Sequence, residues 1–160
     1  MTERTLEDLK KNYESLKEKY DLPSFEEMNS FFTIEKLFEV QTESLLREIR
    51  RFCGERISSG MRIVESMLNP SNVQMFVYAI CKSLTSKEKE TLNEIYKKMT
   101  RFQLKALDID LSFDEKEEAQ FIKEIYQLWE EFSAEMKKIL SNVKCSWDKE
   151  ETKEGKGYFN

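Results

Sequence analysis

Arginine side chains concentrate in one short stretch of this chain, and their guanidinium groups are well suited to binding phosphate or carboxylate. Five of the seven arginines fall between positions 47 and 62, in the segment REIRRFCGERISSGMR. On a continuous helix, Arg47, Arg51, Ser58 and Arg62 lie within about 60° of one another. Each guanidinium offers a planar fork of donors. The strip therefore predicts a site for an anion such as a nucleotide, a phosphorylated metabolite or RNA.

The same strip has a plainer interpretation, in which it is the solvated outer face of an amphipathic helix. Glu48 and Glu55 would then pair with nearby arginines, as charged side chains one helical turn apart commonly do. The opposite face would carry the apolar side chains Ile49, Phe52, Cys53 and Ile63. Both interpretations of the arginine strip stay open at this point.

Arg56 is also a candidate anion-binding residue, but the helical period places it in the middle of the apolar side, between Phe52 and Ile63. An unpaired buried charge is costly, so three alternatives remain. The helix breaks or kinks between Gly54 and Gly60, or Arg56 pairs with a buried carboxylate, or this side faces a partner subunit. A cluster of Gly and Ser is an identifiable cause of a kink. The free amides of a new helix start there would also favour an anion.

Histidine is absent from all 160 residues, which removes the commonest acid/base at neutral pH and the commonest transition-metal ligand. Ser-His-Asp and Cys-His catalysis, HExxH zinc sites and Glu-x-x-His di-iron sites are therefore excluded. The four glycines, at positions 54, 60, 155 and 157, cannot form GxGxxG or GxxxxGK(S/T), the glycine-rich motifs that bind phosphate. We expect no enzyme, no metal and no cofactor.

The acidic segment DIDLSFDEKEEA, residues 108–119, comes nearest to a metal-binding motif. Asp108, Asp110 and Ser112 occupy positions 1, 3 and 5 of a calcium-binding loop. Phe113 then stands where that loop needs glycine, and Ala119 stands where it needs a bidentate Glu. We interpret the segment as a connecting loop that ends in a helix start at Ser112.

Charge and composition narrow the choice of partners. The formal net charge of −5 disfavours attraction to nucleic acid or anionic membranes. Glutamates dilute the lysines of the Thr85–Asp108 region, a candidate helix-turn-helix, so we do not expect nucleic acid as a partner. No apolar run reaches the ~18 residues of a membrane span. Three widely spaced cysteines without a CxxC pair are typical of a reducing compartment, which predicts a cytoplasmic protein.

All the secondary structure that carries these residues is predicted to be helical. Only four Gly and two Pro interrupt the chain. Capping boxes predict helix starts at Ser24, Thr85 and Ser112, and Asn69 followed by Pro70 predicts another. The 25 Glu and 19 Lys, with few Gln, are also typical of proteins from hot environments.

These signals predict an all-α fold, a single bundle of five to six helices over residues 1–143, followed by a charged, flexible tail over 144–160. The apolar period predicts helices ending at Tyr20 and Phe31, and a long one from about Ile34 to Leu68. The segment Ser71–Leu84 is apolar nearly all round, which predicts a buried helix near the centre. Further helices follow the Leu92–Ala106 series and the apolar residues from Phe121 to Val143.

Two functional hypotheses follow from the sequence. The first is a non-catalytic module for self-assembly into a homo-oligomer or for binding another protein. The heptad-like Leu92–Ala106 series and the helix of Trp129 are its predicted contact surfaces. Met61, Met67, Met75, Phe76 and Tyr78 could form a groove, but such stripes are far more often core. The second hypothesis is anion binding by the arginine strip.

Overall fold

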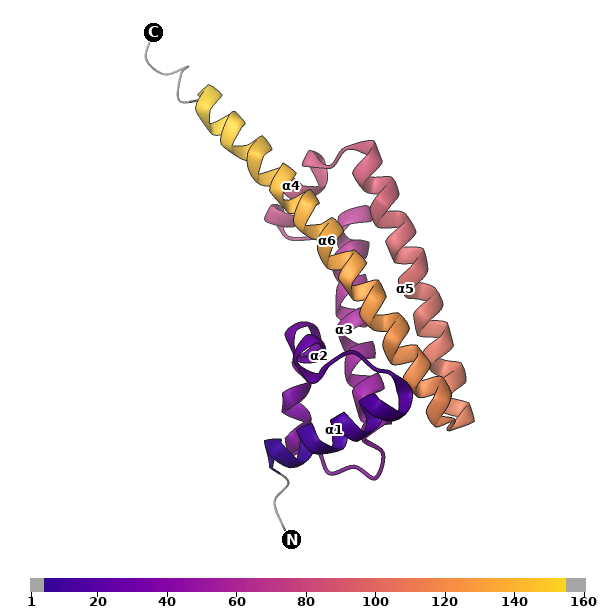
Figure 1. The fold of residues 1–160 in the computed structure, drawn as a ribbon. Coiled ribbons are helices and arrows are strands. Elements are labelled where there is room, and N and C mark those ends of the chain that lie inside the picture. The colour runs from indigo at the N-terminus through magenta and orange to yellow at the C-terminus, as the bar shows by residue number, and fades with distance from the viewer. Residues whose placement is uncertain (1–4, 155–160) are drawn as a thin grey trace.

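Three long helices form the body of this protein. The computed structural model describes residues 5–154, and within them it contains six α-helices, one 3-10 helix and no strand, so the predicted all-α class is confirmed. The long helices α3, α5 and α6 pack against one another, with α1, α2 and η1 at one end and α4 at the other (Figure 1). The elements are α1 (Leu6–Tyr20), α2 (Phe25–Phe32), η1 (Ile34–Glu39), α3 (Leu45–Leu68), α4 (Met75–Ser83), α5 (Ser86–Ser112) and α6 (Glu115–Glu154).

Side-chain capping fixes several helix starts. The predicted capping boxes at Ser24 and Thr85 are confirmed, since each hydroxyl accepts the N–H of a Glu whose carboxylate accepts the cap N–H in return. Thr5 caps α1 in the same way, with Asp8 as its partner. The start predicted at Ser112 is wrong. Asp114 begins α6 instead, because its carboxylate accepts the N–H groups of the first turn.

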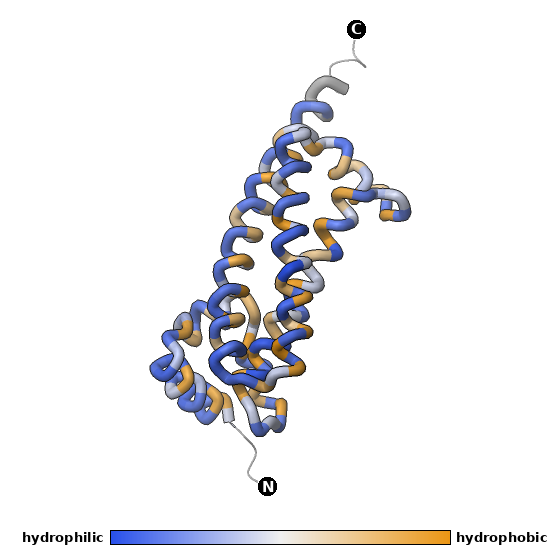
Figure 2. The backbone as a smooth tube through the Cα atoms, turned by 90° about the vertical axis from the view of Figure 1, so that its right-hand side faces the viewer, coloured by the Kyte–Doolittle hydropathy of each residue, from blue (hydrophilic) through white to orange (hydrophobic). Residues whose placement is uncertain are grey.

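The core runs between the three long helices and continues beneath α1, α2 and η1. Apolar residues recur at helical intervals along each long helix (Figure 2). Gly60 lies where α3 packs closely against side chains of α6. A Cβ added there would lie 3.1 Å from the Trp129 ring and 3.3 Å from the Phe132 ring. The largest fully buried side chains include Ile49 and Ile57 of α3, Leu92, Ile95 and Met99 of α5, and Phe121 and Ile122 of α6.

The prediction that Ser71–Leu84 forms the central helix is wrong. No helix starts at Asn69–Pro70, and α4 begins only at Met75. A helix of nine residues is about 14 Å long, too short to line the long helices, and it packs instead at the end of the bundle against α3 and α6. Cys81 is its only buried side chain, whereas Met75 is 87% exposed. Apolar content therefore did not determine burial here.

The helix α3 is continuous from Leu45 to Leu68, so the predicted break between Gly54 and Gly60 does not occur. Its interior serines do not interrupt it, and each hydroxyl is satisfied within the helix by donating to the carbonyl four residues earlier, as Ser58 does to Gly54 at 3.1 Å. The predicted start near Ile34 is also wrong. Residues 34–39 form the 3-10 helix η1, and a short loop separates it from α3.

The last helix is longer than the sequence pattern indicates. Its apolar period ends at Val143, yet α6 continues to Glu154 and projects past the other helices (Figure 1). Trp147 lies in this extension, and its indole N–H donates to the hydroxyl of Ser83 at the end of α4, at 3.3 Å. The part of the predicted tail from residue 155 onward lies outside the described residues. The extension thus contacts the chain's own α4.

Candidate functional site

The arginines of α3 do not gather into one strip, because two of them turn inward. Arg50 is 2% exposed, and its Nε donates to Oε2 of Glu118 at 2.5 Å. Its Nη2 donates to the carboxylate of Asp110. Glu118 is 3% exposed, so this ion pair joins α3 to α6 in the interior, while Asp110 extends it to the end of α5.

Arg47 completes this charged cluster. Its Nη2 donates to the backbone carbonyl of Asp110 at 3.2 Å, and its Nε lies 3.7 Å from Oε1 of Glu118. Its guanidinium also lies 4.0 Å from the centre of the Phe113 ring. Burial raises the pKa of the Asp110 carboxyl, but hydrogen bonding to Arg50 and the charges of the arginines outweigh it, so its pKa is lowered overall. We call Arg47, Arg50, Asp110 and Glu118 the buried charge cluster.

The remaining residues of the predicted strip point in different directions. Ser58 is half-buried and accepts a hydrogen bond from Nε2 of Gln103 on α5 at 2.7 Å. Arg51 is exposed and pairs with Glu48 one turn away, at 3.4 Å. Arg62 is exposed, and it forms no ion pair with any residue that the structure describes. Only Arg51 and Arg62 of the strip therefore present their charge to solvent.

Arg56 needs none of its three predicted explanations, because its side of α3 is not the buried one. Arg56 is exposed, with its guanidinium 5.3 Å from the centre of the Trp129 ring, and Ile63 on the same side is also exposed. The buried stripe of α3 runs instead through Ile49, Arg50, Cys53, Ile57, Gly60, Val64 and Met67.

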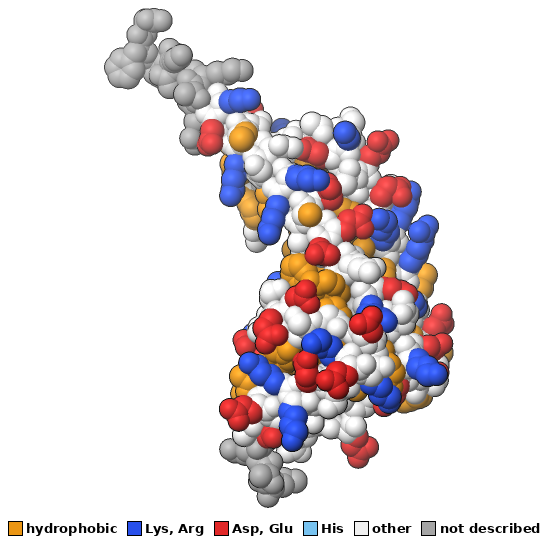
Figure 3. All heavy atoms as spheres, viewed as in Figure 1, with side chains coloured by type: hydrophobic (Ala, Val, Ile, Leu, Met, Phe, Trp, Pro, Cys, Tyr) orange, Lys and Arg blue, Asp and Glu red, His pale blue; other side chains and the backbone are white. Residues whose placement is uncertain are grey.

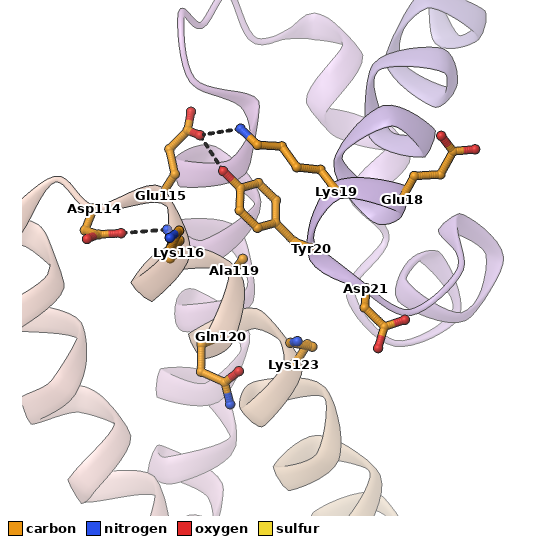
Figure 4. Close-up of a pocket in the computed structure, with 10 residues that line it drawn as sticks. All are labelled: Glu18, Lys19, Tyr20, Asp21, Asp114, Glu115, Lys116, Ala119, Gln120 and Lys123. Carbon is orange, nitrogen blue, oxygen red and sulfur yellow. Dashed lines mark hydrogen bonds and ion pairs between the residues drawn. The ribbon is translucent and has the colours of Figure 1, made fainter.

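An open groove lies between the end of α1 and the start of α6 (Figure 4). Its central polar groups satisfy one another, since Oε2 of Glu115 accepts the Tyr20 hydroxyl at 2.6 Å and the Lys19 ammonium at 3.2 Å. The hydrogen bond from Tyr20, and then that from Lys19, lowers the pKa of Glu115. Across the described residues, no group of three or more acidic or Cys side chains is placed to hold a metal ion. The groove thus offers a wide, charged surface without an organised set of ligands.

The helix α5 presents an unexpected apolar surface. Leu104 is 61% exposed, Leu107 is 62% exposed and Leu111 is 82% exposed. Their three- and four-residue spacing places them on one side of α5, opposite the core residues Ile95 and Phe102. The face seen in Figure 3 carries interspersed acidic and basic side chains, with apolar side chains showing between them. We call Leu104, Leu107 and Leu111 the α5 stripe.

The end of the α5 stripe is marked by a strained residue. Phe113, which directly follows α5, has a φ of 57° and is 71% exposed. The left-handed region costs a bulky L-residue roughly 1–2 kcal/mol. Asp21 and Thr33 end α1 and α2 in the same left-handed conformation, which is a common way for a helix to end. The conformation of Phe113 therefore belongs to the helix end, and its exposed ring extends the apolar surface beyond Leu111.

A second apolar surface lies on α4. Met75, Phe76 and Tyr78 are all exposed, and the ammonium of Lys82 lies 4.8 Å from the centre of the Tyr78 ring. The sequence favoured these residues as core, which is wrong, because α4 lies at the end of the bundle. Met67, by contrast, is buried as predicted.

The self-association surfaces predicted from the sequence are wrong. Leu92, Ile95 and Met99 of the predicted self-association series are buried within the chain's own core, as is Trp129. The residues proposed as a connecting loop, 108–112, are the last turns of α5, and the candidate helix-turn-helix is a single continuous helix. The α5 stripe was visible as a second apolar series at helical spacing, offset from the core series.

Comparison with known proteins gives no further assignment: none of the family models, curated proteins or solved structures matches the chain. Within the described residues, no helix combines the length and the apolar character needed to cross a membrane.

Proposed function

We propose that this chain is a non-catalytic assembly module that pairs with a second copy of itself through the α5 stripe. The observation that carries the proposal is the exposure of three leucines on one side of a helix whose opposite side is core. Scattered single leucines are normal on protein surfaces, whereas contiguous apolar patches mark interaction sites. A stripe at three- and four-residue spacing is also the pattern by which helices pair along their length.

The position of α5 suits this role. It lies along the outer edge of the bundle in Figure 1, with its side toward α6 held by ion pairs. Lys98 contacts Glu131, and Lys105 contacts Glu124, each at 2.6 Å. The helix is therefore a rigid support, so its stripe can be buried against a partner without the ordering cost that a loop would incur.

Anion binding by the arginine strip receives less support. Arg47 makes its contacts with Asp110 and Glu118, and a bound phosphate would have to displace those carboxylates. The exposed Arg51 and Arg62 are eleven residues apart, which is about 16 Å along a helix. One phosphate group cannot contact both of these side chains at hydrogen-bond distance without large movements.

We place the module in the cytoplasm, as the sequence suggested. Cys53, Cys81 and Cys145 are free thiols, which are typical of proteins in a reducing compartment. Burial raises the pKa of the Cys53 thiol well above its ordinary value, so this side chain serves as a small core residue and not as a nucleophile.

The test compares one charged substitution on each apolar surface of the full chain. Leu107→Glu is expected to shift the protein to monomer, because it buries a charge in the proposed contact. Phe76→Glu is the matched control, since Phe76 has a similar exposure of 58% but lies on α4, and it should leave the dimer intact. Sedimentation velocity measures both, with circular dichroism to show that each variant is folded. Dissociation by Phe76→Glu but not by Leu107→Glu would refute the proposal.

A further inference from the structure

We infer that the two copies pair with their α5 helices antiparallel, with Arg101 of each copy next to Asp108 of the other. This inference rests on the proposed function, and it adds the orientation and the residues that determine it. It is carried by the charges beside the α5 stripe. Arg101 and Asp108 are both exposed, and neither forms an ion pair or a side-chain hydrogen bond with any residue that the structure describes.

Arg101 and Asp108 lie on the same flank of the stripe. They are seven residues apart, so they differ by only about 20° around the helix. The two polar residues on the other flank already have partners within the chain. Gln103 donates to Ser58, and Asp110 accepts from Arg50. The charges beside the stripe that have no ion-pair partner in their own chain are therefore positive toward the middle of α5 and negative toward its end, whereas the carboxylate of Asp110 on the other flank is held by Arg50.

A two-fold axis makes this arrangement self-complementary. In such a dimer, residue i of one copy contacts residue j of the other, and j contacts i in return. With the axis between Leu104 and Leu107, Leu104 of one copy packs against Leu107 of the other, and this contact occurs twice. Arg101 then faces Asp108 of the second copy, and this contact also occurs twice.

A parallel pairing does not produce these contacts. In parallel helices the two equivalent flanks lie on opposite sides of the seam, so Arg101 and Asp108 of different copies are kept apart. Ion pairs of this exposure contribute little affinity, but the two Arg101–Asp108 contacts can form only in the antiparallel orientation. The leucines therefore supply the attraction, and the two charges select the antiparallel orientation.

Charge reversal on one copy at a time tests this orientation. Arg101→Asp alone places two acids together at both contacts, and Asp108→Arg alone places two bases together. Each variant is expected to dimerise about tenfold more weakly than the unmodified chain. An equimolar mixture restores both opposite-charge contacts in the heterodimer alone. Native mass spectrometry of the mixture should therefore show mainly heterodimer, and sedimentation velocity should show dimerisation of near unmodified strength.

The possible outcomes distinguish a failure of the antiparallel orientation from a failure of the proposed self-assembly. Heterodimer in excess of its statistical proportion supports the antiparallel contact. Dimers of the unmodified chain, with no excess of heterodimer in the mixture, would overturn the orientation while leaving the proposed function in place. An unmodified chain that stays monomeric would overturn both. Because both substitutions are on the exposed side of α5, circular dichroism should show unchanged helix content, and a loss of helix would count against the exposed placement itself.

Discussion

Arg50 on α3 and Glu118 on α6 form an ion pair in the interior of the bundle, with 2.5 Å between Nε and Oε2. Asp110 at the end of α5 accepts from the same guanidinium, so one side chain links all three long helices. The arginine-rich stretch of the sequence thus contributes to holding the bundle together.

Removing the Arg50 charge should destabilise the fold strongly. Arg50→Met leaves the buried Glu118 with only the more distant Arg47 as partner, and breaking a buried pair from one side costs about 3–5 kcal/mol. Arg51→Met is the matched control, since Arg51 is the next residue and pairs at the surface, where a change stays within about 0.5 kcal/mol. Urea unfolding measures both. Equal free energies of unfolding for the two variants would contradict a stabilising role for the cluster.

The pH dependence of stability should follow from the carboxylates alone. The pKa of Asp110 in the folded state lies below its ordinary value of 3.8, so its contribution is fully present above about pH 4. That contribution is lost as the pH falls through the lower, folded-state pKa. With no histidine in the chain, stability should be nearly constant between about pH 5 and 8. Asp110→Asn should unfold with a shallower dependence on acid, and an unchanged acid profile would argue against its pairing with Arg50.

The two glycines of α3 should respond differently to alanine. A Cβ at Gly54 would meet nothing within 4 Å, so Gly54→Ala should raise the free energy of unfolding by about 0.5–1 kcal/mol. At Gly60 the same Cβ presses on Trp129 and Phe132, and the crowding offsets the gain in helix propensity. Thermal unfolding of the two variants checks this difference. Equal stabilisation by both would mean that Gly60 does not set the distance between α3 and α6.

Anions should have little effect on stability. A ligand at a hundred times its Kd adds about 2.7 kcal/mol, which raises Tm by roughly 5–10 °C for a chain of this size. We expect inorganic phosphate and nucleotides at fixed ionic strength to leave Tm unchanged. A rise that disappears in the Arg51→Ala/Arg62→Ala double variant would instead support the anion hypothesis. Both arginines are exposed, so this variant should fold normally.

Features carried by neighbouring residues were predictable from the sequence. The capping boxes at Ser24 and Thr85 depend on residues three positions apart, and the helix class depends on a local period and few breakers. The buried charge cluster was not predictable in this way. Arg50 and Glu118 are 68 positions apart, and only the packing of α3 against α6 brings them together.

The errors on α4 and α5 share one physical cause. Apolar content shows that a surface favours burial, but it does not show which element covers it. Met75 and Phe76 were therefore assigned to the core although α4 packs at the bundle end, and Leu92 was assigned to a contact although its own chain covers it. The three leucines of the α5 stripe form a second apolar series in the sequence, but only the structure shows which of the two series is exposed.

Self-assembly through α5 can be tested by measuring the mass of the full chain in solution. Sedimentation equilibrium over about a hundredfold range of concentration is the measurement, because dimerisation depends on concentration by mass action. We predict a reversible rise from 19.2 kDa toward twice that mass, and the loss of this rise in Leu107→Glu. A constant mass of one chain throughout the range would contradict self-assembly through α5.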